Sequence, residues 1–321
     1  MRLFLFFIIT TPTHSTFLLF AGLQATMKRL YTICLFLLSG ILSAQPGLQG
    51  IVVEPYYVTG KADASGFNSS GPIENGSVTY RIYVDLEPGY RFQAAYGSPD
   101  HPLEIASDRV FFNHNHSGNT HPNIIPERDL ARDIVLLDSW VSAGAAAENH
   151  MGVPRKFDLL VKDSYLKFKT GFLENTVRLS DTDISPLTVG LSDCDGLTRT
   201  ETLPVTTIYN MDSLGWAMGS VSRAKRLYVE NGAWACMGKG SFGADSLIGN
   251  HVLIAQITTA GKLDYKLNIM IGGPDGKSIQ YVHSNPQDKE ILHQALTGTF
   301  VWNGPEKSDK KSKEKRASKR K

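Results

Sequence analysis

A strictly alternating run, SVTYRIYVDL at residues 77–86, is the feature that most limits the folds open to this chain. Apolar or aromatic side chains occupy every second position of it: Val78, Tyr80, Ile82, Val84 and Leu86. A period of two places alternate side chains on opposite faces of a β-strand, whereas a helix needs a period near 3.6. The run therefore predicts a strand with one buried face and one face that is wet or aromatic.

Further strands and turns follow the same pattern. The turn Glu87-Pro88-Gly89 and the segment YRFQAAY at 90–96 predict a hairpin with this strand, and NHVLIAQITT at 250–259 with LDYKLNIMI at 263–271 predicts a second. Other strands are expected at 50–58, 278–283 and 297–302, and helical spacing at 127–137 and 287–296. We therefore expect an all-β fold, an antiparallel β-sandwich of jelly-roll type with one or two short helices.

The N-terminal region reads as a targeting segment. Residues 27–44, MKRLYTICLFLLSGILSA, have a basic start, a short apolar run and small residues at the end, which is typical of a secretory signal peptide. We expect cleavage between Ala44 and Gln45. Residues 1–26 are interpreted as an upstream extension; the alternative, a membrane hairpin, needs spans of about 20 apolar residues, and each run here is shorter. The mature chain is expected outside the cytoplasm, secreted or at the cell surface or in the periplasm, with no membrane span.

Charge divides the rest of the chain. Residues 45–304 are predicted to form a single β-sandwich domain with a net charge of about −7, and residues 305–321 a disordered tail of about +6. An acidic body argues against nucleic-acid binding by the folded domain. The basic tail is interpreted as solvated, with attraction to anionic polysaccharide, lipid headgroups or DNA as the alternative.

Two cysteines remain after the leader. An oxidising compartment would allow Cys194 and Cys236 to form a disulfide across a long loop, worth about 3–4 kcal/mol if unstrained. The alternative is two unpaired thiols, because a single pair defines no framework.

A set of segments in fixed order resembles a known family. The segments are TYRIYVDL (79–86), FQAAYGSPDHPLEI (92–105), FFN (111–113), LDSWVSAG (137–144), NGAW (231–234) and HVLIAQITTAGKLDYKLNIMIGG (251–273). Together they resemble an all-β domain of unknown function in bacterial secreted and surface proteins, many of them associated with type IX secretion. The resemblance implies one domain over roughly residues 50–285 and assigns no catalytic residue. A C-terminal sorting module is typical of such proteins, whereas this chain ends in the basic tail.

Two groups of side chains have the composition of metal ligands. His114, His116 and His121 lie in FFNHNHSGNTHP and could chelate Zn²⁺ or Cu²⁺, although loop histidines are usually solvated. Carboxylates near a glycine suit Ca²⁺ but lack the spacing of a known loop: Asp181, Asp183, Asp193 and Asp195. We assign no metal or cofactor ligand and keep Ca²⁺ as an alternative.

One glycine-rich segment formally matches a dinucleotide fingerprint. Residues 238–243, GKGSFG, are followed about 20 residues later by Asp264. The fingerprint needs a strand that feeds a helix, and strands are expected here, so we interpret the segment as a loop.

No catalytic motif is found, but the chain has aromatic residues suited to ligand stacking. Gly-x-Ser-x-Gly and His-Glu-x-x-His are both absent from the sequence. Asp138-Ser139-Trp140 would place a carboxylate beside an aromatic platform for a sugar, and Trp140 is the candidate stacking residue; packing in the core is the alternative. Six tyrosines share the same two interpretations: Tyr56, Tyr57, Tyr80, Tyr83, Tyr90 and Tyr96.

These observations favour a secreted, non-catalytic surface or matrix module that binds glycans or mediates adhesion, with extracellular polysaccharide or cell-surface material as partner. The alternatives are a secreted glycan-active hydrolase, whose carboxylates converge only in three dimensions, and a purely structural envelope protein.

Overall fold

The computed structural model describes residues 47–59, 73–130, 134–154, 166–169, 172–175, 196–236, 238, 240–243 and 249–302. The chain divides into two compact units, Met1–Gln45 and Pro46–Lys321, and every described residue belongs to the second. This unit is an all-β sandwich, as the sequence predicts. The predicted signal peptide and its cleavage position at Ala44 and Gln45 lie outside the described residues, as does the basic tail.

A six-stranded central sheet forms the middle layer, in the order β5-β14-β2-β1-β9-β8. Its strands are β1 (Leu48–Val58), β2 (Val78–Leu86), β5 (Trp140–Val141), β8 (Leu166–Lys169), β9 (Phe172–Asn175) and β14 (Asn250–Thr259). The long strands β1 and β14 both pair antiparallel with β2 over its whole length, whereas β9 joins β1 in parallel through one residue pair. The alternating run identified in the sequence is therefore the centre of this sheet.

Two further sheets cover one face of the central sheet. The long outer sheet has the order β11-β13-β3-β16-β17-β18, and the short outer sheet has the order β12-β4-β15-β19. The strands of the long outer sheet are β3 (Arg91–Gly97), β11 (Thr206–Tyr209), β13 (Gly232–Cys236), β16 (Ile269–Gly272), β17 (Ser278–Val282) and β18 (Glu290–Leu292). Those of the short outer sheet are β4 (Leu103–Ser107), β12 (Arg226–Val229), β15 (Leu263–Lys266) and β19 (Thr297–Phe300).

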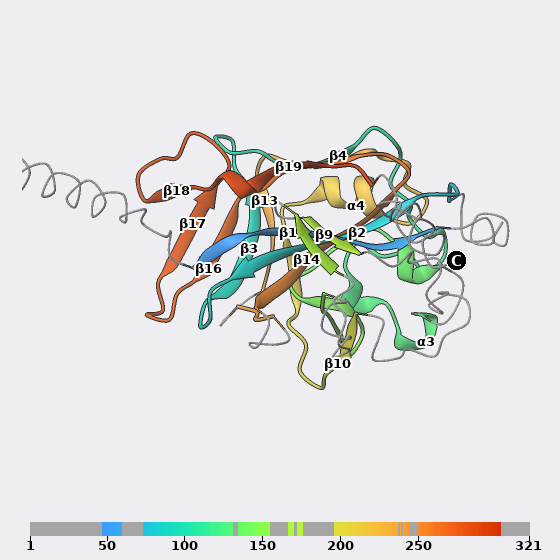
Figure 1. Ribbon diagram of the computed structural model, residues 1–321, viewed down its shortest axis with the longest axis horizontal. Coiled ribbons are helices and arrows are strands. Elements are labelled where there is room, and N and C mark those ends of the chain that lie inside the picture. The colour runs from blue at the N-terminus through green and yellow to red at the C-terminus, as the bar shows by residue number, and fades with distance from the viewer. Residues whose placement is uncertain are drawn as a thin grey trace, which may run out of the picture. The chain divides into compact units, whose positions relative to one another are not determined.

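The opposite face of the central sheet is covered by a small sheet and short helices. The small sheet has the order β10-β7-β6, from β6 (Ala145–Ala147), β7 (His150–Gly152) and β10 (Leu197–Arg199). The helices here are α3 (Glu127–Leu130) and the 3-10 turns η1 (Pro122–Ile124) and η2 (Val135–Leu137). In Figure 1, β4 and β19 run along one side, β1, β2 and β14 cross the middle, and β10 and α3 lie on the other side.

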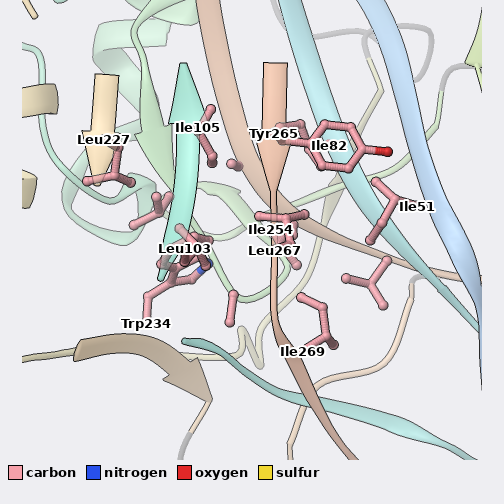
Figure 2. Packing of buried hydrophobic residues seen from close by; sticks show 14 of the residues in the cluster. Ile51, Ile82, Leu103, Ile105, Leu227, Trp234, Ile254, Tyr265, Leu267 and Ile269 are labelled. Atoms are coloured by element: carbon pink, nitrogen blue, oxygen red, sulfur yellow. The ribbon is translucent and has the colours of Figure 1, made fainter. Parts of the chain in front are cut away.

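The main hydrophobic core lies between the central sheet and the two outer sheets. Ile82 of β2 and Ile254 of β14 pack there against Ile105 of β4, Trp234 of β13 and Ile269 of β16 (Figure 2). The helix α4 (Asp212–Met218) also contributes buried side chains to this cluster. A second cluster lies on the far face of the central sheet. Both faces of the central sheet are thus buried, which is unusual for antiparallel strands.

The face of β2 that the sequence predicts to be wet or aromatic is covered instead. Thr79, Arg81 and Tyr83 are all buried on it. Arg81 donates from Nε to Gln256 Oε1 (2.9 Å) and from a guanidinium NH to the Gly196 carbonyl (2.9 Å), and the Tyr83 hydroxyl donates to Glu54 Oε2 (3.0 Å). These bonds satisfy polar groups whose burial would otherwise be costly. The small sheet and the 112–140 segment provide the cover.

Both predicted hairpins are wrong in their pairing. β2 belongs to the central sheet and β3 to the long outer sheet, while β14 belongs to the central sheet and β15 to the short outer sheet. Each turn therefore carries the chain across the core to the opposite layer. Local turn signals reveal that the chain reverses but not which strand it meets next. The pairing of β16 with β17 across the 273–276 turn is a true hairpin.

The helical predictions are confirmed only in part. The 127–137 segment contains α3 and η2, separated by a short undescribed stretch. The 287–296 segment instead forms β18, in parallel pairing with β17, followed by the 3-10 turn η5 (Gln294–Leu296). The α4 helix was not predicted. Within the described part of the chain, no helix has the length and apolar character needed to cross a membrane.

Candidate functional site

The candidate stacking residue Trp140 lies in the core. Its side chain is 2 % exposed and belongs to the second hydrophobic cluster, and its neighbour Asp138 is fully buried. An indole in this position has no face to offer a ligand. The structure therefore favours the packing interpretation of Trp140 and corrects its assignment as a platform.

Most of the candidate tyrosines are core residues as well. Tyr56, Tyr57, Tyr80 and Tyr83 are buried, whereas Tyr90 and Tyr96 are half-buried. Burial raises the pKa of Tyr80 and of Tyr96 to about 12 in each case. These phenols are thus structural groups rather than a continuous aromatic surface.

The histidine-rich loop is held by Asp138 rather than by a metal-like arrangement. Asp138 accepts hydrogen bonds from the backbone N–H groups of His114 and Asn119, both at 2.8 Å. His114 is itself buried, and its Nδ1 accepts from the N–H groups of His116 and Ser117. Among the described residues, no three His, Cys, Asp or Glu side chains are placed to hold a metal ion.

Several predicted residues cannot be placed. Cys194 and the four candidate calcium-binding aspartates lie outside the described residues. Cys236 ends β13 and is half-buried, and burial raises the pKa of its thiol. The disulfide and the Ca²⁺ alternative therefore remain predictions.

The glycine-rich segment has a structural explanation. Ser241 pairs with Phe92 of β3 through two backbone hydrogen bonds of 2.8 and 2.9 Å. Gly240 has a φ of +77°, and a Cβ there would lie 2.7 Å from the Phe92 carbonyl oxygen. Glycine is needed for this close approach of two backbones. The next described element along the chain is the strand β14, which is not the helix that a dinucleotide fingerprint requires.

A surface cavity lies on the solvent face of the short outer sheet. Its volume is about 430 Å³, and it is lined by Glu104, Ala106, Asp264, Tyr265, Lys266, Thr297, Gly298 and Thr299. We call it the groove. Its size lies within the usual range of small-ligand sites, about 300–1,000 Å³.

On β12, β4 and β15, the alternation of side chains along each strand determines which of them face the groove. Leu227, Ile105 and Tyr265 point into the core, where Figure 2 shows them among the packed residues. Because side chains alternate along a strand, their neighbours point to solvent. The register makes two rows of the outward residues: Arg226, Ala106, Asp264 and Thr299 in one, and Tyr228, Glu104, Lys266 and Thr297 in the other.

The small side chain of Ala106 explains the hollow. Ala106 lies between Arg226 and Asp264 in its row, so a methyl group stands where the neighbouring strands carry long polar side chains. The groove floor is therefore rigid backbone and one methyl group, and its walls carry hydrogen-bonding groups.

The charges around the groove neutralise one another. Glu104 contacts Arg226 and also Lys266 (3.6 Å), and Asp264 contacts Lys262 (2.8 Å). Thr299 donates its hydroxyl to Asp264 Oδ1 at 2.6 Å. The guanidinium of Arg226 also lies over the Tyr228 ring, 4.1 Å from its centre. Within the two rows, Arg226 and Lys266 balance Glu104 and Asp264, and the surface is rich in hydrogen-bond donors and acceptors.

The two carboxylates of the groove differ from a glycosidase pair in the ionisation of Asp264, not in their separation. Glu104 and Asp264 are diagonal neighbours on adjacent strands, a relation that separates Cβ atoms by about 7 Å. Hydrogen bonds from Lys262 and Thr299 outweigh partial burial and lower the pKa of Asp264. A glycosidase acid needs a raised pKa instead. Asp264 is therefore suited to accept hydrogen bonds in its ionised form and not to donate the proton.

A second cavity of about 700 Å³ lies at the ends of β7 and β10 and is lined by Asn149, Arg199, Thr200 and Glu201. Its lining comes mainly from turn residues at strand ends. The groove is the stronger candidate because its lining residues stand on three paired strands, β4, β15 and β19, and are held in register.

Sequence reasoning missed the groove, although part of its signal was present. Asp264 and Lys266 alternate with apolar residues in the predicted 263–271 strand, which marks a polar outward face. What the sequence lacks is the pairing that brings β4 and β19 beside β15, and β12 beside β4. Comparisons with family models, curated proteins and solved structures gave no match to this chain.

Proposed function

We propose that this domain is a non-catalytic binding module that takes an uncharged glycan in the groove. The observation that carries the proposal is the two-row array of polar side chains around Ala106, whose charges cancel. Sugar hydroxyls both donate and accept hydrogen bonds, so they match carboxylate acceptors, ammonium and guanidinium donors, and threonine hydroxyls on one surface. A neutral ligand fits because the groove has no excess charge to attract an ion.

The setting of this function is part of the proposal. The signal-like residues 27–44 support export, and the ordered set of segments supports kinship with the surface-protein domain that the sequence resembles. We propose that the domain acts at the cell surface or in the extracellular matrix. Extracellular polysaccharide is the corresponding partner.

A substitution that fills the groove tests the binding proposal. Ala106→Leu adds an apolar side chain to the solvent face of β4, where it blocks the hollow without entering the core. We expect a glycan array to identify uncharged glycans that the natural protein binds and that Ala106→Leu binds at least about tenfold more weakly, a loss of about 1.4 kcal/mol. Ser278→Leu, on the exposed start of β17, is the matched control and should bind normally.

A second control uses an Asp–Lys ion pair that does not line the groove, Asp275 with Lys277. Asp264→Asn removes a groove acceptor, whereas Asp275→Asn removes the carboxylate that pairs with Lys277 in the 273–276 turn. We expect only Asp264→Asn to weaken glycan binding. Absence of glycan binding by the natural protein, or equal binding by Ala106→Leu, would contradict the proposal. Cleavage of a bound glycan in a parallel turnover assay would replace it with the hydrolase alternative.

A further inference from the structure

The α4 helix carries a tryptophan that faces solvent. Leu214, Ala217 and Met218 are buried on the core side of the helix. Trp216 lies on the other side and is 81 % exposed. The remaining tryptophans are different: Trp140 and Trp234 are buried, and Trp302 packs partly buried against the main core. An indole left in water forgoes the favourable burial of a large apolar surface.

The backbone around Trp216 is held in place by several hydrogen bonds. The Ser222 hydroxyl donates to the carbonyls of Trp216 and Ala217, at 2.5 and 3.2 Å. Asn113, from the segment after β4, donates its side-chain amide to the same Ala217 carbonyl at 3.2 Å. The exposed indole therefore stands on a fixed support and is not part of a fraying helix end.

The loop that follows the helix is strained. Val221 adopts a φ of +65° and is 69 % exposed. A β-branched residue rarely occupies this left-handed region, because its Cβ comes too close to the following carbonyl oxygen. A strained backbone of this kind persists only where the surrounding structure holds it in place, and it is found most often at binding and active sites. Strain in the loop and exposure of the tryptophan thus occur at the same place.

A hydrogen-bond acceptor lies one helical turn before the indole. Asp212 and Trp216 are four residues apart in α4, a spacing that puts both on one side of the helix, and Asp212 is exposed. Gly215 leaves space beside them, because a Cβ at that position would meet nothing within 4 Å. The result is an exposed aromatic side chain with a carboxylate on the same side of the helix.

We infer that Trp216 and Asp212 form a second ligand site, which stacks one sugar ring on the indole and binds its hydroxyls through the carboxylate. An aromatic face accepts the C–H side of a ring, and a carboxylate accepts hydrogen bonds from hydroxyl groups. A protein partner fits less well, because a stable interface covers about 800 Å² per partner. The exposed large apolar side chains here are Trp216 and Val221, and their exposed neighbours Ser220 and Arg223 are polar. This inference rests on the glycan class proposed above but uses none of the groove residues.

Tryptophan fluorescence tests the site directly. Since the other indoles are shielded, iodide quenching of the intact protein reports mainly on Trp216. We expect uncharged hexasaccharides of β-1,4-glucan, α-1,4-glucan or β-1,4-mannan to give saturable protection from iodide. Ala106→Leu should keep this protection, which separates failure of the groove from failure of this site.

Variants complete the test by isothermal titration calorimetry with the hexasaccharide that gives the strongest protection. In the Ala106→Leu background, where the groove is blocked, Trp216→Ala should lose this binding by at least tenfold, and Trp216→Phe should retain part of it. Asp212→Ala should weaken it severalfold, while Asp288→Ala, at another exposed aspartate, should not. No protection by any of the hexasaccharides, or unchanged binding by Trp216→Ala, would overturn the inference.

Discussion

Asp138 shows how a single residue sets the path of a long loop. Its two carboxyl oxygens accept the backbone N–H groups of His114 and Asn119, and it is completely buried beneath them. Burial outweighs these hydrogen bonds and raises the pKa of Asp138 to about 8. The residue that the sequence suggested as a neighbour of a sugar platform is instead a buried anchor.

A pH dependence of stability follows from the raised pKa of Asp138. The folded state holds a proton that the unfolded chain releases near pH 4, so stability decreases as pH rises from about 4 to about 8 and then levels off. Asp138→Asn cannot titrate and should remove this part of the slope. The variant should also be about 1–3 kcal/mol less stable, because its NH₂ group faces backbone donors.

Urea unfolding from about pH 5 to pH 9 measures both effects of Asp138→Asn. Burial lowers the pKa of His121, His283 and His293, so those residues reduce stability as pH falls through their unfolded pKa, which is the opposite direction. Comparing the variant with the natural protein cancels this contribution. Parallel pH profiles for the two proteins would show that Asp138 does not hold the proton.

At the level of elements, the close contacts between strands depend on missing side chains. Gly97 ends β3 at the junction of the two outer sheets, and a Cβ there would lie 1.9 Å from the backbone oxygen of Val229 in β12. The backbone of Val229 is fixed by the pairing of β12 with β4, so it cannot move away cheaply. The two outer sheets therefore meet through a glycine.

Gly97→Ala should destabilise the domain by about 1–3 kcal/mol, because the added methyl group overpacks this junction. Gly50→Ala in β1 is the control, since a Cβ there would lie an ordinary 3.8 Å from Ala295. That control should change stability by less than about 0.5 kcal/mol. Thermal unfolding of both variants is the measurement; equal stability would mean that the two sheets can separate without cost.

At the scale of the whole domain, the central sheet couples two cores. Trp234 lies in the main cluster and Trp140 in the second, and strands β2 and β14 contribute side chains to both. Loss of the central sheet would expose both clusters at once. We therefore expect the domain to unfold in one cooperative transition.

Trp140→Phe and Trp234→Phe each leave one buried indole as a reporter. In each variant, the fluorescence transition in urea should coincide with the transition measured by far-ultraviolet circular dichroism. Separate midpoints in either variant would show that one core melts independently and that the layers are distinct folding units.

The sequence predicted individual strands better than their partners. The alternation at 77–86 and the apolar run at 250–259 correspond to β2 and β14. The single strand predicted at 263–271 is wrong, because this segment forms β15 and β16 in different sheets. Their predicted hairpins are wrong because a turn records only a local reversal, and the choice of sheet depends on which distant apolar faces are buried together. The site was missed for the same reason: Glu104 and Asp264 are 160 positions apart in the numbering and meet only through the pairing of β4 with β15.

By itself, the sequence determined the all-β class and the strand periodicity, because side-chain alternation is a local property of extended backbone. Tertiary structure alone decided what each face touches. It buried Trp140 and left Trp216 in solvent, although an indole has the same burial preference at both positions. It also covered the polar face of β2 and assembled the groove around Ala106. These outcomes depend on contacts between residues that are distant in the chain, and no local pattern encodes them.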